Sequence, residues 1–135
     1  MVTCRIVEVN GFVLWGYVLE LPDGWTIVSG GARGVDQVAE HAAAEHGGLY
    51  WCSFRPRKAA DGSYRIFMAC DADPAGQECS HKRMYPSFGA AAFARNRLIV
   101  QHSQRIVAFN AGTAGTRNTV AIAHELGIPV EEIHP

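Results

Sequence analysis

Glycines and polar side chains gather where a short apolar segment, 25–29 (WTIVS), meets a helix-forming one. The segment is followed at once by three glycines and an arginine, with an acid just inside the helix: Gly30, Gly31, Arg33, Gly34 and Asp36. Glycines let a backbone approach a ligand closely, and unpaired amides at a helix start point toward an anion. The loop is therefore predicted to hold a phosphate, and the alternative is a tight turn in which Asp36 bonds nearby amides. Ser29 replaces the first glycine of a dinucleotide fingerprint, and no lysine follows the last glycine as in a Walker loop.

A second glycine loop, 110–116 (NAGTAGT), also lies between an apolar segment and a helix-forming one. Its candidate ligand contacts are Gly112, Thr113, Gly115 and Thr116, and the Thr116 hydroxyl can cap the helix or reach a phosphate oxygen. A third element is Arg95-Asn96-Arg97 within a predicted helix, where Arg95 can fork onto a phosphate or carboxylate; the alternative is a surface arginine. If both loops follow strands of one sheet, they meet at its carboxyl edge, where such folds bind ligands.

The elements that must position these residues alternate along the chain. β-Branched and apolar runs predict strands at 5–9, 25–29, 49–54, 105–109 and 129–133, whereas apolar residues at helical spacing predict helices at 35–46, 90–101 and 116–126. Residues 12–21 fit a helix or a strand. This alternation predicts an α/β fold with a mostly parallel sheet and helices on both of its faces. We expect one domain over 1–135.

The stretch 55–86 differs from the rest and is predicted to be an excursion from the core. Asp61-Gly62 between two β-type runs indicates a hairpin, and the polar stretch 71–82, with Pro74 and Gly76, is predicted to be a loop. Basic and aromatic residues alternate between positions 50 and 83. They suit stacking with single-stranded nucleic acid, and the alternative is a hairpin with ordinary solvated charges. The set comprises Arg55, Arg57, Lys58, Arg65, Lys82 and Arg83 with Tyr50, Trp51, Phe54 and Tyr64.

Composition narrows the class of protein. The chain has 135 residues, 48% hydrophobic and 19% charged, with a net charge of −1. These values indicate a globular chain without the cationic field that duplex DNA or an anionic membrane attracts. The sequence has no run of about 20 apolar residues that could span a membrane. The first residues are not followed by the apolar stretch of a signal peptide, so we expect a cytoplasmic protein with no membrane partner.

The cysteines show no C-x-x-C spacing, so free thiols and no metal are expected in a reducing compartment. The alternative is a zinc site formed by four residues of one stretch: Cys52, Cys70, Cys79 and His81.

Four segments together resemble the SLOG superfamily, named for the DNA-processing protein A and "lonely guy" families. They are similar above all to its small stand-alone YspA/YpsA-like members: 28–36 (VSGGARGVD), 94–97 (ARNR), 109–117 (FNAGTAGTR) and 127–130 (GIPV). The resemblance covers about two thirds of the chain and implies a Rossmann-like three-layer fold. Its pocket would take a nucleotide or nucleotide-derived ligand, with no other cofactor required. Carried over by position, the lining is Gly30, Gly31, Arg33, Gly34, Asp36, Arg95, Asn96, Gly112, Thr113, Gly115 and Thr116. Many members have Gly-Ser-Arg after the first strand, whereas this chain has Asn10-Gly11-Phe12.

The same resemblance bears on catalysis. Hydrolases similar to "lonely guy" carry Pro-Gly-Gly-x-Gly-Thr-x-x-Glu, and the glutamate position corresponds here to Thr119, which cannot handle a proton at neutral pH. We therefore expect a binding or sensing module. The alternative is a nucleoside-phosphate N-glycosidase that uses Asp36, and a second is single-stranded nucleic-acid binding through 50–83. Small folds of this kind often pair through helix faces, so a homodimer is also considered.

Overall fold

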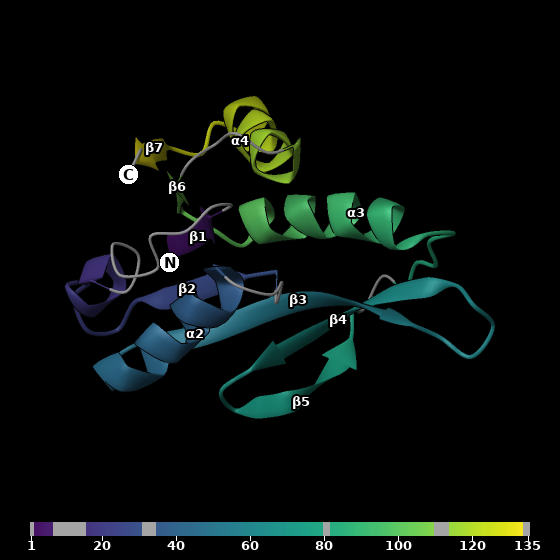
Figure 1. Cartoon of the computed structure of the whole chain (residues 1–135), viewed down its shortest axis with the longest axis horizontal. Coiled ribbons are helices and arrows are strands. Elements are labelled where there is room, and N and C mark those ends of the chain that lie inside the picture. The colour runs from purple at the N-terminus through teal and green to yellow at the C-terminus, as the bar shows by residue number, and fades with distance from the viewer. Residues whose placement is uncertain (1, 7–15, 31–34, 80–81, 110–113, 134–135) are drawn as a thin grey trace.

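The computed structural model describes residues 2–6, 16–30, 35–79, 82–109 and 114–133. Its described strands form a single sheet in the order β5-β4-β3-β2-β1-β6-β7 (Figure 1). The bounds, in chain order, are β1 Val2–Ile6, β2 Thr26–Ser29, α2 Val35–His46, β3 Tyr50–Lys58, β4 Tyr64–Cys70, β5 Asp73–Glu78, α3 Phe88–Gln101, β6 Arg105–Phe109, α4 Ala114–Leu126 and β7 Val130–Ile133. A helical turn at 16–19 precedes β2.

The fold is of the α/β class, as predicted, but the sheet is mixed, which corrects the expectation of a mostly parallel one. Strands β3, β2, β1, β6 and β7 are parallel neighbours, whereas β4 and β5 are antiparallel additions beside β3. The connections explain the difference. A parallel neighbour needs a crossover of a dozen or more residues, and the short turns from β3 to β4 and from β4 to β5 permit only antiparallel pairing.

Helices pack against both faces of the sheet. Neighbouring residues of a strand point to opposite faces. On β2, Ile27 packs against alanines of α2, whereas Val28 packs against Ile99 of α3. On β6, Val107 joins the cluster of α2, and Ile106 packs on the side of α3 and α4. Figure 1 shows α3 and α4 on one side of the strands and α2 on the other.

Most predicted elements appear close to their predicted bounds. Helix α2 and strand β6 match, and α3 begins at Phe88 because Ser87 caps it, accepting a hydrogen bond on Oγ from the amide of Ala90 at 3.1 Å. The first strand lies at Val2–Ile6, three residues before the predicted start at position 5. Residues 7–9 of that prediction lie outside the described residues.

The expectation of an excursion at 55–86 is wrong in part. The hairpin is present, with β3 and β4 paired from Cys52–Cys70 to Lys58–Tyr64. The hairpin belongs to the main sheet, however, and Phe54 and Ile66 are buried in the core under α3. Residues 73–78 form β5 and not the predicted loop.

Strand β5 tolerates residues that disfavour strands because it lies at the edge of the sheet. Pro74 needs no hydrogen-bonded partner on the open side. Gly76 has a φ of +80°, and a Cβ atom there would lie 2.9 Å from the carbonyl oxygen of Met68, at a register shift between β4 and β5. Within the described part of the chain, no helix is long and apolar enough to cross a membrane.

Candidate functional site

The described residues of both glycine loops lie at one edge of the sheet. Strands β2 and β6 both pair in parallel with β1, so their carboxyl ends point the same way. Gly30 follows β2 directly, and Gly115 and Thr116 occupy the first turn of α4 after β6. Asp36 is in the first turn of α2, and its side chain lies outside the described residues. Four predicted glycine-loop contacts and an arginine also lie outside them: Gly31, Gly34, Gly112, Thr113 and Arg33.

Arg95 of α3 is buried at this edge, so the alternative of a surface arginine is wrong. Its side chain comes from the middle of α3, and the residue is only 3% exposed. Nη1 donates a hydrogen bond to the carbonyl oxygen of Gly30 at 2.5 Å, and Nε donates to the carbonyl oxygen of Ala92 at 3.3 Å. This contact joins two motifs that are 65 residues apart in the sequence.

The first glycine of the loop is required by this contact. A Cβ atom at position 30 would lie 2.6 Å from Nη1 and 2.8 Å from Cζ of Arg95. Non-bonded carbon atoms pack at about 3.5 Å or more, so any larger residue would displace the guanidinium. Gly30 therefore allows a buried cation to lie directly against the backbone at the start of the glycine loop.

Three further polar residues, on α3 and in the first turns of α4, are also buried. Asn96 is 1% exposed, and its Nδ2 donates to Oδ1 of Asn118 at 3.2 Å. Thr116 is fully buried in the first turn of α4. Thr119 is 1% exposed, and its Oγ1 donates to the carbonyl oxygen of Gly115 at 3.1 Å. Asn96 and Thr116, which were both predicted to contact the ligand, are thus both buried.

Two polar residues of α4 and β2 were not predicted as site residues. Asn118 bonds Asn96 across the two helices, and Ser29 is fully buried at the end of β2. Ser29 could have been noticed as the one polar residue that closes the apolar strand WTIVS. Asn118 carries no such signal, because an asparagine in the first turns of a helix is most often solvated.

Two described features of this edge carry positive charge or potential. A buried guanidinium is costly unless oxygen atoms or a negative charge face it. The first turn of α4 contains no acidic residue, so nothing in that turn opposes the positive end of the helix dipole. Arg95 and the amino end of α4 therefore both contribute positive potential on the side of the sheet where β2 and β6 end.

The cysteines of the zinc alternative lie elsewhere, on β3, on β4 and just after β5, and all three are half-buried. Cys52 and Cys70 are register partners across β3 and β4, and Cys79 packs into the same cluster as Cys52. Burial, followed by the neighbouring Cys70, Cys79 and Asp71, raises the pKa of Cys52 to about 11, and burial also raises that of Cys79. Among the described residues no three candidate ligands are grouped for a metal ion, and His81 lies outside them.

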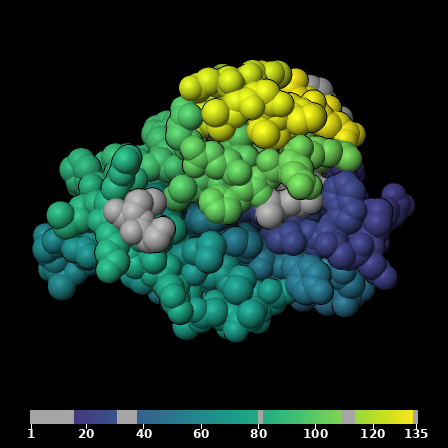
Figure 2. Space-filling model, turned by 180° about the vertical axis from the view of Figure 1, so that it is seen from behind, coloured from purple at the N-terminus to yellow at the C-terminus, as the bar shows by residue number. Residues whose placement is uncertain are grey.

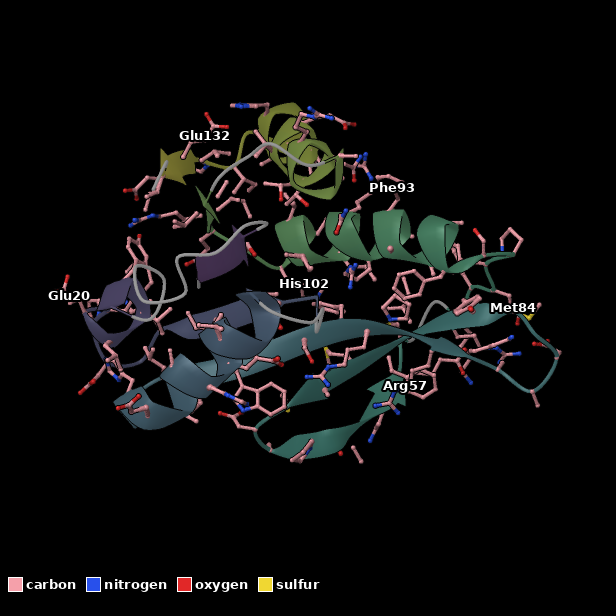
Figure 3. The ribbon with its side chains drawn as sticks, viewed as in Figure 1. Glu20, Arg57, Met84, Phe93, His102 and Glu132 are labelled. Carbon is pink, nitrogen blue, oxygen red and sulfur yellow. The ribbon has the colours of Figure 1, made fainter. Side chains whose placement is uncertain are left out.

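The basic and aromatic residues of 50–83 are divided between the two faces of the hairpin. Register pairing places Arg57 and Arg65 on one face and Lys58 and Tyr64 on the other. Figure 3 shows Arg57 on the side of the hairpin away from α3. Phe54 is 1% exposed and cannot stack with a base.

Other members of this set are already engaged within the protein. Tyr64 packs edge-on against Phe88, with ring centroids 5.9 Å apart. Arg55 pairs with Glu40 of α2 at 2.7 Å, and Arg65 lies 3.5 Å from Glu78 of β5.

Comparisons with protein-family models, with curated proteins and with solved structures find no match to this chain.

Proposed function

We propose that this protein binds a nucleotide or nucleotide-derived ligand at the carboxyl edge of the sheet, in a Rossmann-like three-layer fold. The observation that carries the proposal is the buried contact between Arg95 and Gly30. Their motifs are distant in the sequence, and the contact adjoins the point where the first glycine loop begins. A buried arginine against the backbone of Gly30, at the edge of the sheet where α4 also begins, suits the phosphate of such a ligand.

The proposal assigns different roles to the residues of the edge. The backbone amides of the first loop, from Gly30 to Gly34, would hold one phosphate, and those of the second loop, from Gly112 to Thr116, would hold another or the ribose. Arg95 would set the charge of the site. Its hydrogen bond to Gly30 ties the first loop to α3, so the guanidinium orients the loop as well as attracting the ligand.

Binding without turnover is favoured over hydrolysis. The position that corresponds to the glutamate of "lonely guy"-like hydrolases is Thr119, whose hydroxyl is buried and donates to the carbonyl oxygen of Gly115. A threonine engaged within its own helix supplies no proton transfer. An N-glycosidase would instead have to use Asp36, and release of base from nucleoside monophosphates that Asp36→Ala abolishes would establish that alternative.

The test is thermal unfolding of the whole chain against nucleoside mono-, di- and triphosphates, ADP-ribose, NAD and cyclic nucleotides. A ligand at a hundredfold excess over its dissociation constant stabilises the native state by about 2.7 kcal/mol. Thr116→Val removes one buried hydroxyl from the amino end of α4 and should reduce the stabilisation by the ligand. Thr26→Val, at the amino end of β2, is the matched control and should leave it unchanged.

Absence of a shift with every ligand at millimolar concentration would reject the proposal. A shift that Thr116→Val and Thr26→Val leave equally intact would place the ligand away from the second glycine loop.

A further inference from the structure

A hollow of about 410 Å³ lies on another side of α3, between the helix and the segment 83–85 that follows β5. Figure 2 looks onto this side of the molecule, where α3 in green lies between α4 in yellow and the teal strands β4 and β5. In Figure 3, Met84 lies at the end of the molecule away from β7, and Phe93 lies beside the middle of α3. The lining includes Arg83, Tyr85, Phe93, Ala94, Arg97 and Gln101. The volume is within the range of pockets for small organic ligands, about 300–1,000 Å³.

The lining of this hollow is positively charged. Two of its residues, Arg83 and Arg97, are arginines, and none of the described residues that line it is an aspartate or a glutamate. Arg97 makes an ion pair with Glu125 of α4 at 3.0 Å, with side chains that are 44% and 60% exposed. Exposed pairs of this kind contribute little to stability, so an anion in the hollow can compete with Glu125 for the guanidinium.

The hollow also has aromatic walls. Phe93 is 49% exposed, although a ring of this size is usually buried. Tyr85 is held in place by two backbone hydrogen bonds with Tyr64, each 2.8 Å long. The small side chain of Ala94 leaves room between the helix and Tyr85. A planar group placed here would remove apolar surface of Phe93 from water.

We propose that this hollow binds a small organic anion that carries a planar ring. The carboxylate or phosphate of the anion lies between Arg83 and Arg97, and its ring packs on Phe93 and Tyr85. Guanidinium groups bind both oxyanions through two parallel hydrogen bonds. This site does not depend on the proposed nucleotide site, because Arg95 and Asn96 leave α3 on its buried face and line no part of the hollow.

Fluorine NMR of para-fluorophenyl phosphate and para-fluorobenzoate, titrated with the whole chain, tests the proposal. We expect saturable binding of at least one probe and none of the uncharged para-fluorobenzyl alcohol. Arg97→Ala should weaken binding about tenfold and Phe93→Ala several-fold. Both side chains are half exposed, so both variants should fold. Arg117→Ala, which removes an exposed arginine of α4 outside the hollow, is the matched control.

One variant separates a binding role of Arg97 from a structural one. Glu125→Gln removes the competing carboxylate and should tighten binding of the anionic probe, whereas a purely structural role of the ion pair would give no gain. Preference for the phosphate or the carboxylate probe identifies the oxyanion. The proposal is overturned if neither probe binds at about 10 millimolar, or if Arg97→Ala binds as the wild type does. It is likewise overturned if Thr116→Val, and not Phe93→Ala, abolishes binding, because the probe would then occupy the proposed nucleotide site.

Discussion

Replacement of Gly30 by alanine tests how closely Arg95 packs against the end of β2. The added Cβ atom would lie 2.6 Å from Nη1 and 2.8 Å from Cζ, both too close for atoms that are not bonded. The guanidinium must therefore move, although the residue is only 3% exposed and has little room to do so. When it moves, it loses its hydrogen bond to the Gly30 carbonyl oxygen.

The expected magnitude follows from these contacts. A hydrogen bond to a charged group contributes about 1.5–3 kcal/mol, and crowding in a packed interior costs about 1–3 kcal/mol. The flexible arginine relieves part of the crowding, and alanine restricts the unfolded chain, which returns about 0.4–1 kcal/mol. We expect Gly30→Ala to lower the free energy of unfolding by about 1–2 kcal/mol. With a urea slope of about 2 kcal/mol per molar, the unfolding midpoint should fall by roughly 0.5–1 M.

The assay is a double-mutant cycle in urea. Gly30→Ala is measured in the wild type and in an Arg95→Met background, where the shorter, uncharged side chain removes the two closest contacts, with Nη1 and Cζ, and the hydrogen bond. The cost of Gly30→Ala should fall by about 1 kcal/mol or more in that background. Gly89→Ala is the control, because a Cβ atom on this exposed glycine of α3 meets only Ser87 Oγ, at 4.0 Å, and alanine should be neutral or slightly stabilising. An equal cost in both backgrounds would refute the packing argument.

Three further predictions concern stability and titration. Gly76→Ala should lower the free energy of unfolding in urea by about 1 kcal/mol more than Gly62→Ala does. Both glycines have a positive φ, but only at Gly76 would a Cβ atom lie 2.9 Å from a backbone oxygen, that of Met68. Equal losses of stability would contradict this. Cys52, with its pKa raised to about 11, should react with iodoacetamide slowly at pH 8 and faster up to pH 11, followed by mass spectrometry. Since this pKa exceeds the ordinary 9.0, the contribution of the neutral thiol to stability is complete below pH 9 and declines toward pH 11. Ser87→Ala should lower stability by about 1 kcal/mol through loss of the α3 cap, and an unchanged urea midpoint would show that the cap contributes nothing.

The sequence pattern within a segment was sufficient to predict those elements whose residues show a clear pattern of their own. The spacing of Val38, Ala39, Ala42 and Ala43 predicts α2, and these positions pack toward β2 because one stripe of the helix must be buried. The hairpin between β3 and β4 was also predictable, since Asp61-Gly62 favours a tight turn and Gly62 takes a φ of +85°.

Strand β5 could not be predicted in this way. Its sequence, DPAGQE, has neither alternation nor β-branched residues, and it is a strand only because β4 offers an unpaired edge. The parallel share of the sheet was overestimated because the segment 55–86 was expected to leave the core, whereas its hairpin extends the main sheet with antiparallel strands beside β3. Of the predicted site residues, Gly30 and Arg95 are in contact and Asn96 is buried, whereas Asp36 and the centres of both loops lie outside the side chains described, so the ligand site stays a prediction.

The segment Arg95-Asn96-Arg97 shows why a continuous motif need not be one site. Successive residues of a helix are about 100° apart, so three in a row cannot share a face. Arg95 and Asn96 are buried and bond Gly30 after β2 and Asn118 of α4 respectively, whereas Arg97 is half exposed beside the hollow between α3 and the segment 83–85. Substitution of Arg97 should therefore change binding of the ring-bearing anion and leave a nucleotide at the sheet edge unaffected, while substitution of Arg95 should do the reverse and also reduce stability. If Arg97→Ala and Arg95→Met impair the same ligand equally, the two arginines serve one site, and the separation argued from the helix geometry is wrong.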